Sequence, residues 1–338
     1  MERLAGRGWQ IEWFSGAYPG AKPREVIDGV TYVREGGQLT VHFCAYRRYR
    51  TSKQFDIVVD EINTIPFMTP LYMSSARVAF INQLARGVWR HEAGPVVGRV
   101  GEYLEPVYLR PYRNCPIISI SPSSIQSFRD IGMRGPMYLL PMSVDELADE
   151  IPPEKAAPQD IIVLGRVTPS KRIEHSIDAA AVLAAKGWGG RLLIVGSGKE
   201  QYLANLKARA SAQAAPVAFL GRVTNEERRE LLRRSSALWM TSIREGWGLV
   251  VTEAARHWTP SVVYNVPGLC DAVIDGVTGY VTSSEPSALA NATWRLFKDH
   301  YTGLSSGAFR NSLAYSWDGT ADACQDALCD VMARAPRN

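Results

Sequence analysis

Two glutamates, Glu245 and Glu253, stand eight residues apart in the segment REGWGLVVTEA at residues 244–254, with a glycine-flanked tryptophan between them. A carboxylate is a poor partner for a phosphate but a good acceptor for vicinal sugar hydroxyls. The flanking glycines free backbone amides to face an anion, and the dipole of a helix starting there favours negative charge. Gly246 and Gly248 are these glycines, and the amides belong to Trp247, Gly248 and Leu249. The segment indicates a ligand site, or, as the structural alternative, a glycine turn that opens a helix with two solvated acids.

Two cations stand in the segment GRVTPSK, residues 165–171, where Arg166 and Lys171 follow a glycine and a short apolar run. An arginine fork and a lysine ammonium near a helix N-terminus suit a diphosphate, because the charges and the free N–H groups point at the anion. Two solvated cations beside a helix start are the alternative. Two glycine turns are weaker signals. The turn GSGKE, residues 196–200, suits a phosphate, and the turn GRV, residues 221–223, suits a nucleobase.

The elements that must position these residues alternate regularly in the second half of the chain. Short apolar runs suit buried parallel strands, and they occur at residues 161–166, 191–198, 217–223, 237–242 and 261–265. A helix is expected over 173–185, and Thr224 is expected to cap another. Strands alternating with helices at this pitch predict βαβ units and a doubly wound parallel sheet, in which ligands bind at the carboxyl ends of the strands.

The first half repeats the alternation less regularly. Strands are expected at residues 55–61, 76–82, 115–121 and 137–141, and helices at residues 83–90, 97–112 and 123–131. An acidic, proline-rich stretch, DELADEIPPEKAAPQD, separates the two halves as a linker. We therefore predict an α/β protein with an N-terminal domain at residues 1–145, a linker at 146–159, a C-terminal domain at 160–305 and terminal helices at 306–338.

The chain start departs from this pattern. Residues 4–14 read as the end of a helix followed by a strand, as though a preceding strand and glycine-rich turn were missing. In a doubly wound sheet of order 3-2-1-4-5-6 the first strand is central, so its loss leaves the neighbouring strands with unpaired backbone groups. Either the chain starts late, or the N-terminal domain is built without its usual first strand.

The composition is that of a soluble globular protein with two cores, since 46% of the 338 residues are hydrophobic and 21% are charged. A net charge of +4 and a pI ≈ 8.8 suit an anionic ligand or an acidic membrane surface, and do not argue for nucleic acid. Five scattered cysteines without zinc spacing indicate reduced thiols. No secretory signal and no run of about 18 apolar residues is present, so a cytoplasmic location is expected.

Several ordered motifs together resemble the nucleotide-sugar domain of the retaining family-four glycosyltransferases of GT-B fold. They are GRVTPSK, LLIVGSGKE, FLGRVTNEE and SIREGWGLVVTEAARHWTPSVVYNVPGLCDAVIDGVTGYV. The resemblance covers residues 161–281 closely, and Glu245 and Glu253 meet the acid-x7-acid signature of the family. It implies two Rossmann-like domains facing a cleft, with a nucleotide diphosphate sugar as donor. It also implies that no metal or other cofactor is needed, because arginine, lysine and helix N-termini offset the leaving-group charge.

The resemblance implies a catalytic set. Arg166 and Lys171 would clamp the donor diphosphate, and Glu245 would bind hydroxyls of the transferred sugar. The diphosphate oxygen would help to deprotonate the acceptor during front-face attack with retention. Where such enzymes commonly carry a histidine near the donor sugar, this chain has Asn82, whose amide can bond a hydroxyl but cannot exchange a proton near neutral pH. That departure and the missing first strand bear on turnover more than on donor binding.

The resemblance also implies binding residues around the donor. Glu253 would take the ribose hydroxyls, and Val223 would lie by the base. The backbone at Gly165 and along residues 246–249 would line the sugar and the phosphates. Of the five histidines, none stands at a position that we interpret as catalytic.

Two further stretches bear on partners. Residues 314–328 show helical alanine and leucine spacing, and in GT-B proteins the terminal helix commonly crosses back to the first domain. The basic run AYRRYRTSK, residues 45–53, can dock on anionic lipid headgroups or bind a phosphate on a lipid-linked acceptor. A solvated basic loop is the alternative, and contact with the inner face of a membrane would then be absent.

Three functions remain open on these residues. The first is a retaining, metal-independent hexosyltransferase in polysaccharide biosynthesis that acts on a hydroxyl of a glycan, a lipid-linked or a small-molecule acceptor. The second is a catalytically impaired partner protein that binds a nucleotide sugar. The third is a sugar-nucleotide epimerase of the same architecture, which usually needs a histidine and carboxylate acid–base set that this chain lacks.

Overall fold

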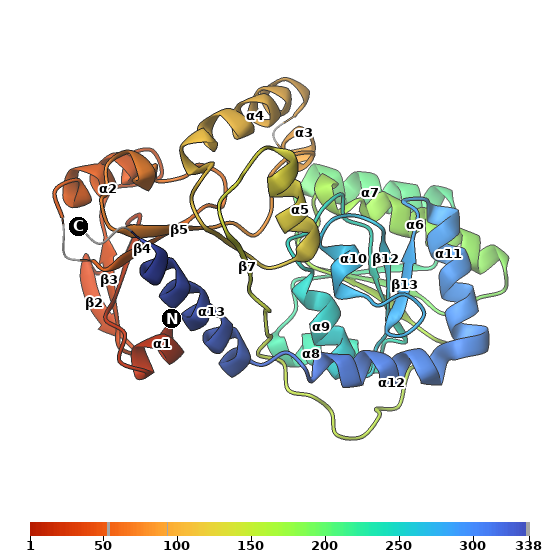
Figure 1. The fold of residues 1–338 in the computed structure, drawn as a ribbon. Helices are drawn as coiled ribbons and strands as arrows, with labels where there is room; N and C mark the ends of the chain where they lie inside the picture. Colours follow the sequence, from red (N-terminus) through yellow and green to blue (C-terminus); the bar gives the residue numbers. More distant parts are fainter. Residues whose placement is uncertain (53–54, 93, 336–338) are drawn as a thin grey trace.

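Two α/β bodies lie side by side, and the last helix of the chain joins them (Figure 1). The computed structural model describes residues 1–52, 55–92 and 94–335. The predicted α/β fold with parallel sheets in two domains is confirmed. The predicted boundaries near 145, 159 and 305 stay predictions.

The C-terminal body is built on a six-stranded sheet in which every pair of neighbouring strands is parallel. In spatial order its strands are β10 (Val217–Gly221), β9 (Leu192–Val195), β8 (Ile161–Leu164), β11 (Ala237–Met240), β12 (Ser261–Tyr264) and β13 (Gly279–Thr282). Strands β9, β11 and β12 are buried along their whole length, as the continuous apolar runs predict for strands covered on both faces. The order reverses between β8 and β11, so their carboxyl ends form the switch point where ligands bind in such sheets.

Helices cover both faces of this sheet (Figure 1). They are η3 (Pro169–Lys171), α6 (Ile173–Ala185), α7 (Glu200–Ala212), α8 (Asn225–Arg234), α9 (Leu249–Arg256), α10 (Leu269–Ala272), α11 (Pro286–Arg295), η4 (Leu296–His300) and α12 (Tyr301–Ser312). Helix α6 has the predicted bounds. Thr224 caps α8 as predicted, with a complete capping box to Glu227.

The N-terminal body carries two sheets. The first contains β1 (Ile11–Ser15), β2 (Arg24–Ile27) and β3 (Val30–Arg34), with β3 between the others. The second contains β4 (Ile57–Glu61), β5 (Ala76–Phe80), β6 (Ile117–Ser119) and β7 (Met137–Leu139), all parallel. Among the described residues no ladder joins β1 to β4, so both are edge strands. The N-terminal body is thus built on two separate sheets.

The helical prediction for residues 83–90 is wrong over most of its length. The helices here are α2 (Val41–Tyr49), α3 (Val88–Glu92), α4 (Pro95–Tyr108) and α5 (Pro122–Asp130), with 3-10 turns η1 (Thr69–Leu71) and η2 (Arg110–Tyr112). Residues 83–87 form a loop because side chains from α4 take its amides. Glu105 Oε1 accepts the amide of Ala85 at 2.6 Å, and Glu102 Oε1 accepts that of Gly87 at 2.9 Å.

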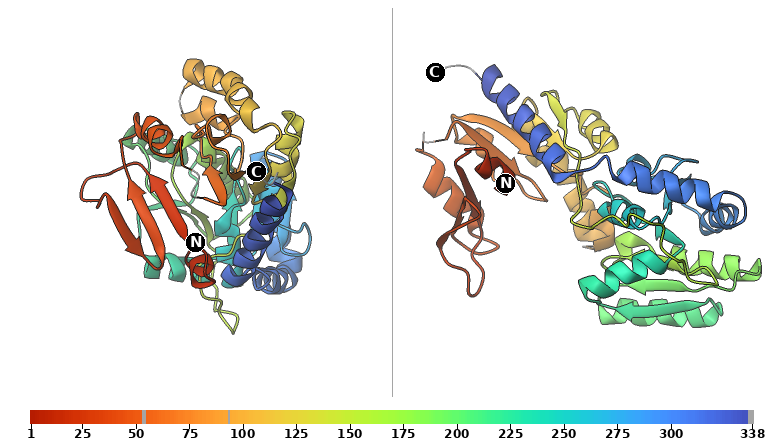
Figure 2. Two further views of the ribbon diagram at one scale, coloured as in Figure 1. Left: turned by 60° about the vertical axis from the view of Figure 1, so that its left-hand side comes forward. Right: turned by 90° about the horizontal axis from the view of Figure 1, so that it is seen from below.

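The terminal helix α13 (Trp317–Arg334) runs from the end of α12 to the N-terminal sheets (Figure 2). It packs on α1 (Glu2–Gly6) and β5, with the ion pairs Arg3–Asp318 at 2.7 Å and Arg7–Asp322 at 2.6 Å at its start. Ala327, Leu328 and Val331 join a core that also contains residues of both bodies. Within the described part of the chain, no helix is long and apolar enough to cross a membrane.

Candidate functional site

The loops at the carboxyl ends of the C-terminal strands approach one another closely. A Cβ on Gly196, after β9, would lie 1.8 Å from the carbonyl oxygen of Gly165, after β8. A Cβ on Gly198 would lie 2.0 Å from the carbonyl oxygen of Val167, with which it forms an isolated bridge. Only glycine fits at these two positions, so the GSG turn brings two strand-end loops into backbone contact.

The structure brings Lys171 and Glu245 together. Lys171 Nζ forms an ion pair with Glu245 Oε1, and Ser242 Oγ donates to the same oxygen at 2.6 Å. The two charged side chains are 23% and 16% exposed, so the pair is mostly sheltered from water. Because an ammonium has three donors, Lys171 can hold Glu245 and still reach an anion. This pair joins the two motifs that the sequence placed in the site.

Arg172 holds the loop that carries Glu245, and sequence reasoning did not select it. Its backbone adopts a left-handed conformation, with φ at 49°. Its guanidinium donates to the carbonyl oxygens of Thr241 and Ser242, both at 2.7 Å, and lies 4.9 Å above the ring of Tyr264. A planar fork satisfies both carbonyls and a ring face at once, which lysine could not do. The signal was present, since Arg172 directly follows the GRVTPSK motif.

The glycines around Glu245 have steric roles. Gly248 adopts φ of 88° and precedes α9, so the amides of the first turn are directed out of the helix end. A Cβ on Gly268 would lie 2.1 Å from the carbonyl oxygen of Glu245, whose amide in turn donates to Pro267 at 3.0 Å. The indole of Trp247 is 8% exposed and donates to Thr252 Oγ1 at 3.2 Å. Its side chain therefore packs in the core, which leaves only its backbone for a ligand.

Glu253, in α9, is held by an arginine that sequence reasoning missed. Arg228 Nη1 lies 2.7 Å from Glu253 Oε2, and Arg228 Nη2 lies 2.6 Å from Glu146 Oε2. Glu146 belongs to the interdomain segment, residues 140–160 between β7 and β8, and its side chain is fully buried. Arg229 Nε also reaches Glu146, at 2.7 Å. The predicted ribose carboxylate is thus tied through one guanidinium to the interdomain segment.

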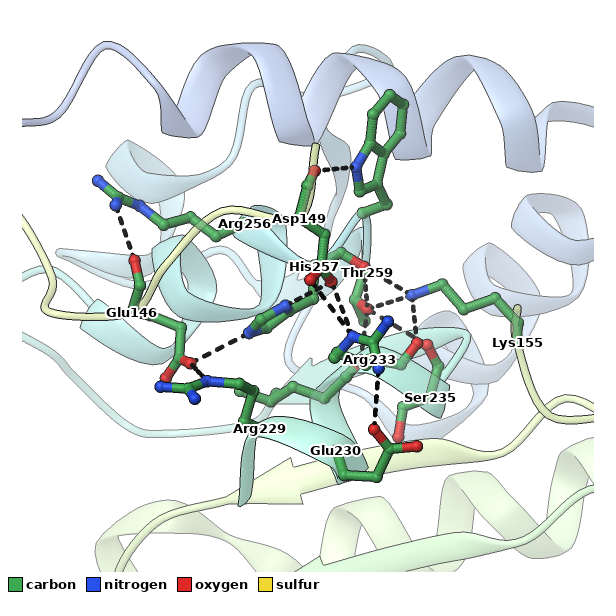
Figure 3. Close-up of polar contacts among 12 residues, drawn as sticks. Glu146, Asp149, Lys155, Arg229, Glu230, Arg233, Ser235, Arg256, His257 and Thr259 are labelled. Atoms are coloured by element: carbon green, nitrogen blue, oxygen red, sulfur yellow. Dashed lines mark hydrogen bonds and ion pairs between the residues drawn. The ribbon is translucent and has the colours of Figure 1, made fainter. Parts of the chain in front are cut away.

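The interdomain segment is fixed by a buried polar network around His257 (Figure 3). His257 is fully buried, with Nδ1 2.7 Å from Asp149 Oδ2 and Nε2 3.2 Å from Glu146 Oε1. Lys155 Nζ donates to the carbonyls of Arg233 and His257 and to Thr259 Oγ1 at 2.7–2.9 Å. Burial lowers the pKa of Lys155 to about 7. The network anchors this segment on α8 and the end of α9.

Other predicted site residues also lie at the carboxyl ends of the C-terminal strands, but they make fewer contacts with the rest of the site. Gly165, Arg166 and Lys171 line one pocket together with Thr241 and Ser242. Arg166 is exposed and forms no ion pair with any residue that the structure describes. Val223 is half-buried against the core below the loop after β10. The diphosphate and base roles of these residues stay predictions.

Asn82 lies across from the glutamate loop. A Cβ on Gly246 would lie 3.4 Å from Asn82 Cβ and 2.9 Å from Ile120 Cδ1, so the carboxyl ends of β5 and β6 face those of β11. Asn82 Oδ1 is buried and has no hydrogen-bond partner among the described residues. A buried amide oxygen without a partner is costly, which is consistent with a polar group of a ligand beside it. Its predicted catalytic role stays a prediction.

A second contact joins the bodies at α5, also beyond the sequence prediction. The backbone amide of Ser123 donates to Asp271 Oδ2 at 3.1 Å, and the amide of Gly268 donates to Ser123 Oγ at 2.7 Å. Arg244 Nη1 donates to Ser127 Oγ at 3.3 Å. Burial lowers the pKa of Arg244, and the nearby Glu105 carboxylate opposes that shift. These contacts hold the first residue of REGWG against the N-terminal body.

The assembled site suits an anion that carries hydroxyls. Lys171 supplies charge, the turn before α9 supplies amides, and Glu245 and Glu253 supply two acceptors on either side. Within the described residues, no cluster of three or more histidine, cysteine or acidic side chains has the geometry to hold a metal ion.

Two Rossmann-like bodies whose strand ends face each other define the GT-B fold, and solved structures share it. The chain superposes on sucrose-phosphate synthase from Thermosynechococcus elongatus with a TM-score of 0.77 and 18% identity, covering 98% of this chain and 91% of that one. WaaG, a glycosyltransferase involved in lipopolysaccharide biosynthesis, gives a TM-score of 0.71 with 15% identity, covering 96% and 92%. HepE from Anabaena, in complex with UDP-glucose, gives 0.68 with 15% identity over 90% and 87%.

Residues 145–308 match the family model described as Glycosyl transferases group 1. The chain therefore has the GT-B fold, and its C-terminal part is similar to that family. It is 35% identical over 199 residues to D-inositol 3-phosphate glycosyltransferase from Streptomyces griseus, covering 53% of this chain and 42% of the relative. It is 34% identical over 125 residues to glycogen synthase from Mycobacterium tuberculosis, covering 37% and 30%. The chain thus spans less than half the length of these curated relatives.

Proposed function

We propose that this chain is a retaining glycosyltransferase that moves a hexose from a nucleotide diphosphate sugar to a hydroxyl of a glycan, lipid-linked or small-molecule acceptor. The observation that carries the proposal is the Lys171–Glu245 pair, set beside the amides before α9 and faced by Asn82 from the other body. The names of the relatives, which are glycosyltransferases and synthases, support the same class.

Each residue has a distinct task in this proposal. Lys171 and Arg166 offset the negative charge that grows on the leaving diphosphate, so that no metal ion is required. Glu245 holds hydroxyls of the sugar through its second oxygen, while Lys171 and Ser242 fix the first. Glu253, oriented by Arg228, takes the ribose hydroxyls.

Asn82 and the loop around it exclude water once the cleft closes on the donor. Its side-chain amide orients a sugar hydroxyl but moves no proton, because it does not titrate near neutral pH. The proton of the acceptor hydroxyl passes to the leaving diphosphate, and the new bond forms on the same face of the sugar.

A two-stage assay tests the proposal. Thermal-shift titrations with UDP-, GDP- and ADP-sugars should raise the melting temperature with one nucleotide class. With that donor, release of free nucleotide should then depend on an added acceptor and persist in EDTA. A rise in melting temperature without turnover for any acceptor would mean that the chain is a nucleotide-sugar-binding partner protein. No response to any nucleotide sugar would refute the donor site itself.

A further inference from the structure

Helix α4, Pro95–Tyr108, turns an apolar face to solvent. The residues of this face recur three, four and seven positions apart and so share one side of the helix. Their exposed fractions run from 39% to 80%, and they are Val96, Val97, Val100, Tyr103, Leu104 and Val107. We call this set the α4 face. An amphipathic helix of a globular protein normally buries such a face, so its exposure over the whole helix indicates a binding surface.

The other side of α4 is fixed by close packing, which prevents the α4 face from turning inward. A Cβ on Gly98 would lie 2.5 Å from Arg90 Cα, and a Cβ on Gly101 would lie 2.7 Å from the ring of Trp89. The two glycines therefore let α3 approach α4 at backbone distance. Glu105 is buried on the same side, where it accepts the amide of Ala85.

The charges around the α4 face favour an anionic partner. The two acids of the helix lie on the packed side, since Glu102 pairs with Arg90 and Glu105 is buried. Arg99, on the helix, and Arg110, just beyond its end, are exposed. The whole net charge of +4 falls within residues 1–145, because the rest of the chain carries equal numbers of acidic and basic residues.

Helix α2 adds to the same side of the molecule. It carries the first part of the basic run at residues 45–53, whose last residue, Lys53, lies outside the described part. Phe43 and Tyr46 are 65% and 42% exposed on it. Both helices lie on the upper side of the N-terminal body in Figure 1 and in the left view of Figure 2, with α4 outermost. A flat anionic surface can meet a single convex helix with cations around it, whereas a protein partner would need a matching groove.

We propose that the α4 face docks on the surface of an anionic lipid bilayer. The apolar side chains enter the boundary between headgroups and acyl chains, and Arg99 and Arg110 pair with lipid phosphates. The position of the α4 face suits the proposed function, and the access of a lipid-borne acceptor described next rests on that function. Helix α3 contacts η3, and Glu92 bonds Ser170 next to Lys171, so docking sets the donor loop beside the membrane. An acceptor hydroxyl carried by a lipid can then reach the cleft without leaving the bilayer.

Vesicle co-sedimentation of the full chain tests the proposal, with phosphatidylcholine vesicles alone and with added phosphatidylglycerol. The wild type should bind only the anionic vesicles. Leu104→Asp should weaken that binding about tenfold or more. The matched control is Leu313→Asp, because Leu313 is 52% exposed and Leu104 47%, and Leu313 lies between α12 and α13. The double variant Arg99→Gln, Arg110→Gln should weaken binding about fivefold per cation removed.

Three outcomes would overturn the proposal. Equal binding by Leu104→Asp and Leu313→Asp would place the membrane contact elsewhere, and no binding by the wild type would exclude a bilayer as partner. A wild-type dimer in sedimentation velocity that Leu104→Asp dissociates would show that a second copy covers the α4 face.

Circular dichroism and a nucleotide-sugar thermal shift should be unchanged in Leu104→Asp. Loss of vesicle binding with an intact thermal shift separates this inference from the proposed donor site.

Discussion

Exchanging Arg228 for glutamine should weaken nucleotide binding, whereas the same change at Arg229 should not. Both arginines pair with the buried carboxylate of Glu146, at 2.6 Å and 2.7 Å, but only Arg228 also holds Glu253. Arg228→Gln leaves Glu253, which is 18% exposed, without its charged partner. A hydrogen bond to a charged group contributes about 1.5–3 kcal/mol. Because Glu253 can turn partly to water, we take the lower end, which corresponds to about tenfold in the dissociation constant.

Stability should change in both variants and so cannot explain that difference. Glu146 keeps His257 and one arginine in either case, so Arg228→Gln should lower the free energy of unfolding by about 1–2 kcal/mol rather than the full cost of an orphaned buried charge. Isothermal titration with the free nucleotide diphosphate, alongside urea unfolding, measures both quantities. In turnover the effect should appear in KM and not in kcat, since ribose is held equally before and during transfer. Equal nucleotide affinity in the two variants would refute the assignment of Glu253 through Arg228.

Three further outcomes follow from the same geometry. Glu253→Ala should weaken nucleotide binding while Glu245→Ala mainly lowers the rate of transfer, and unchanged kinetics in both would remove the two acids from the site. Gly246→Ala should lower kcat/KM with little change in nucleotide affinity, because its Cβ would lie 2.9 Å from Ile120 across the cleft; unaltered kcat/KM would mean that the bodies separate during turnover. Glu146→Gln should flatten the acid side of the stability profile. Burial alone would raise the pKa of Glu146, but bonds from Arg229 and His257 hold it below its usual value. Its ionised form therefore stabilises the fold above the unfolded pKa, and this contribution is lost as the pH falls through the folded pKa. Across acidic pH, the melting temperature of Glu146→Gln should change less with pH than that of the wild type.

Most of the C-terminal sheet was predictable because its central strands are buried along nearly their whole length, whereas β13 was not predicted. Continuous apolar runs are typical of such strands, and α6 was predicted with the bounds that the structure has. The proximity of the loops that carry Lys171 and Glu245 followed from topology, since loops at the carboxyl ends of adjacent strands must meet. Local sequence and the general rules of parallel sheets were sufficient for that half of the site.

Interactions between distant residues explain what the sequence did not predict. Residues 83–87 have helical spacing, but two glutamates fifteen and twenty residues further on take the amides of Gly87 and Ala85. Arg228 lies in α8 among many other charges, so nothing local distinguishes it from solvated neighbours. Its role appears only when the interdomain segment folds back and buries Glu146 beside it. The strands β2 and β3 were likewise missed in a half-exposed stretch that lacks a continuous apolar run.

The two carboxylates of the acid-x7-acid pair are held by different parts of the molecule, and under the proposed function this difference separates donor binding from transfer. Glu245 is fixed by Lys171 and Ser242, which belong to its own body. Asn82 and Ile120 of the other body lie against the adjacent turn at Gly246. Glu253 has the opposite arrangement, because Arg228 connects it to the segment that links the bodies, while no contact across the cleft is needed. Movement of the bodies should therefore expose the sugar site without disturbing the ribose carboxylate. Under the proposed function, a nucleotide would then stay bound in an open cleft, and closure of Asn82 over the sugar would be the step that permits transfer.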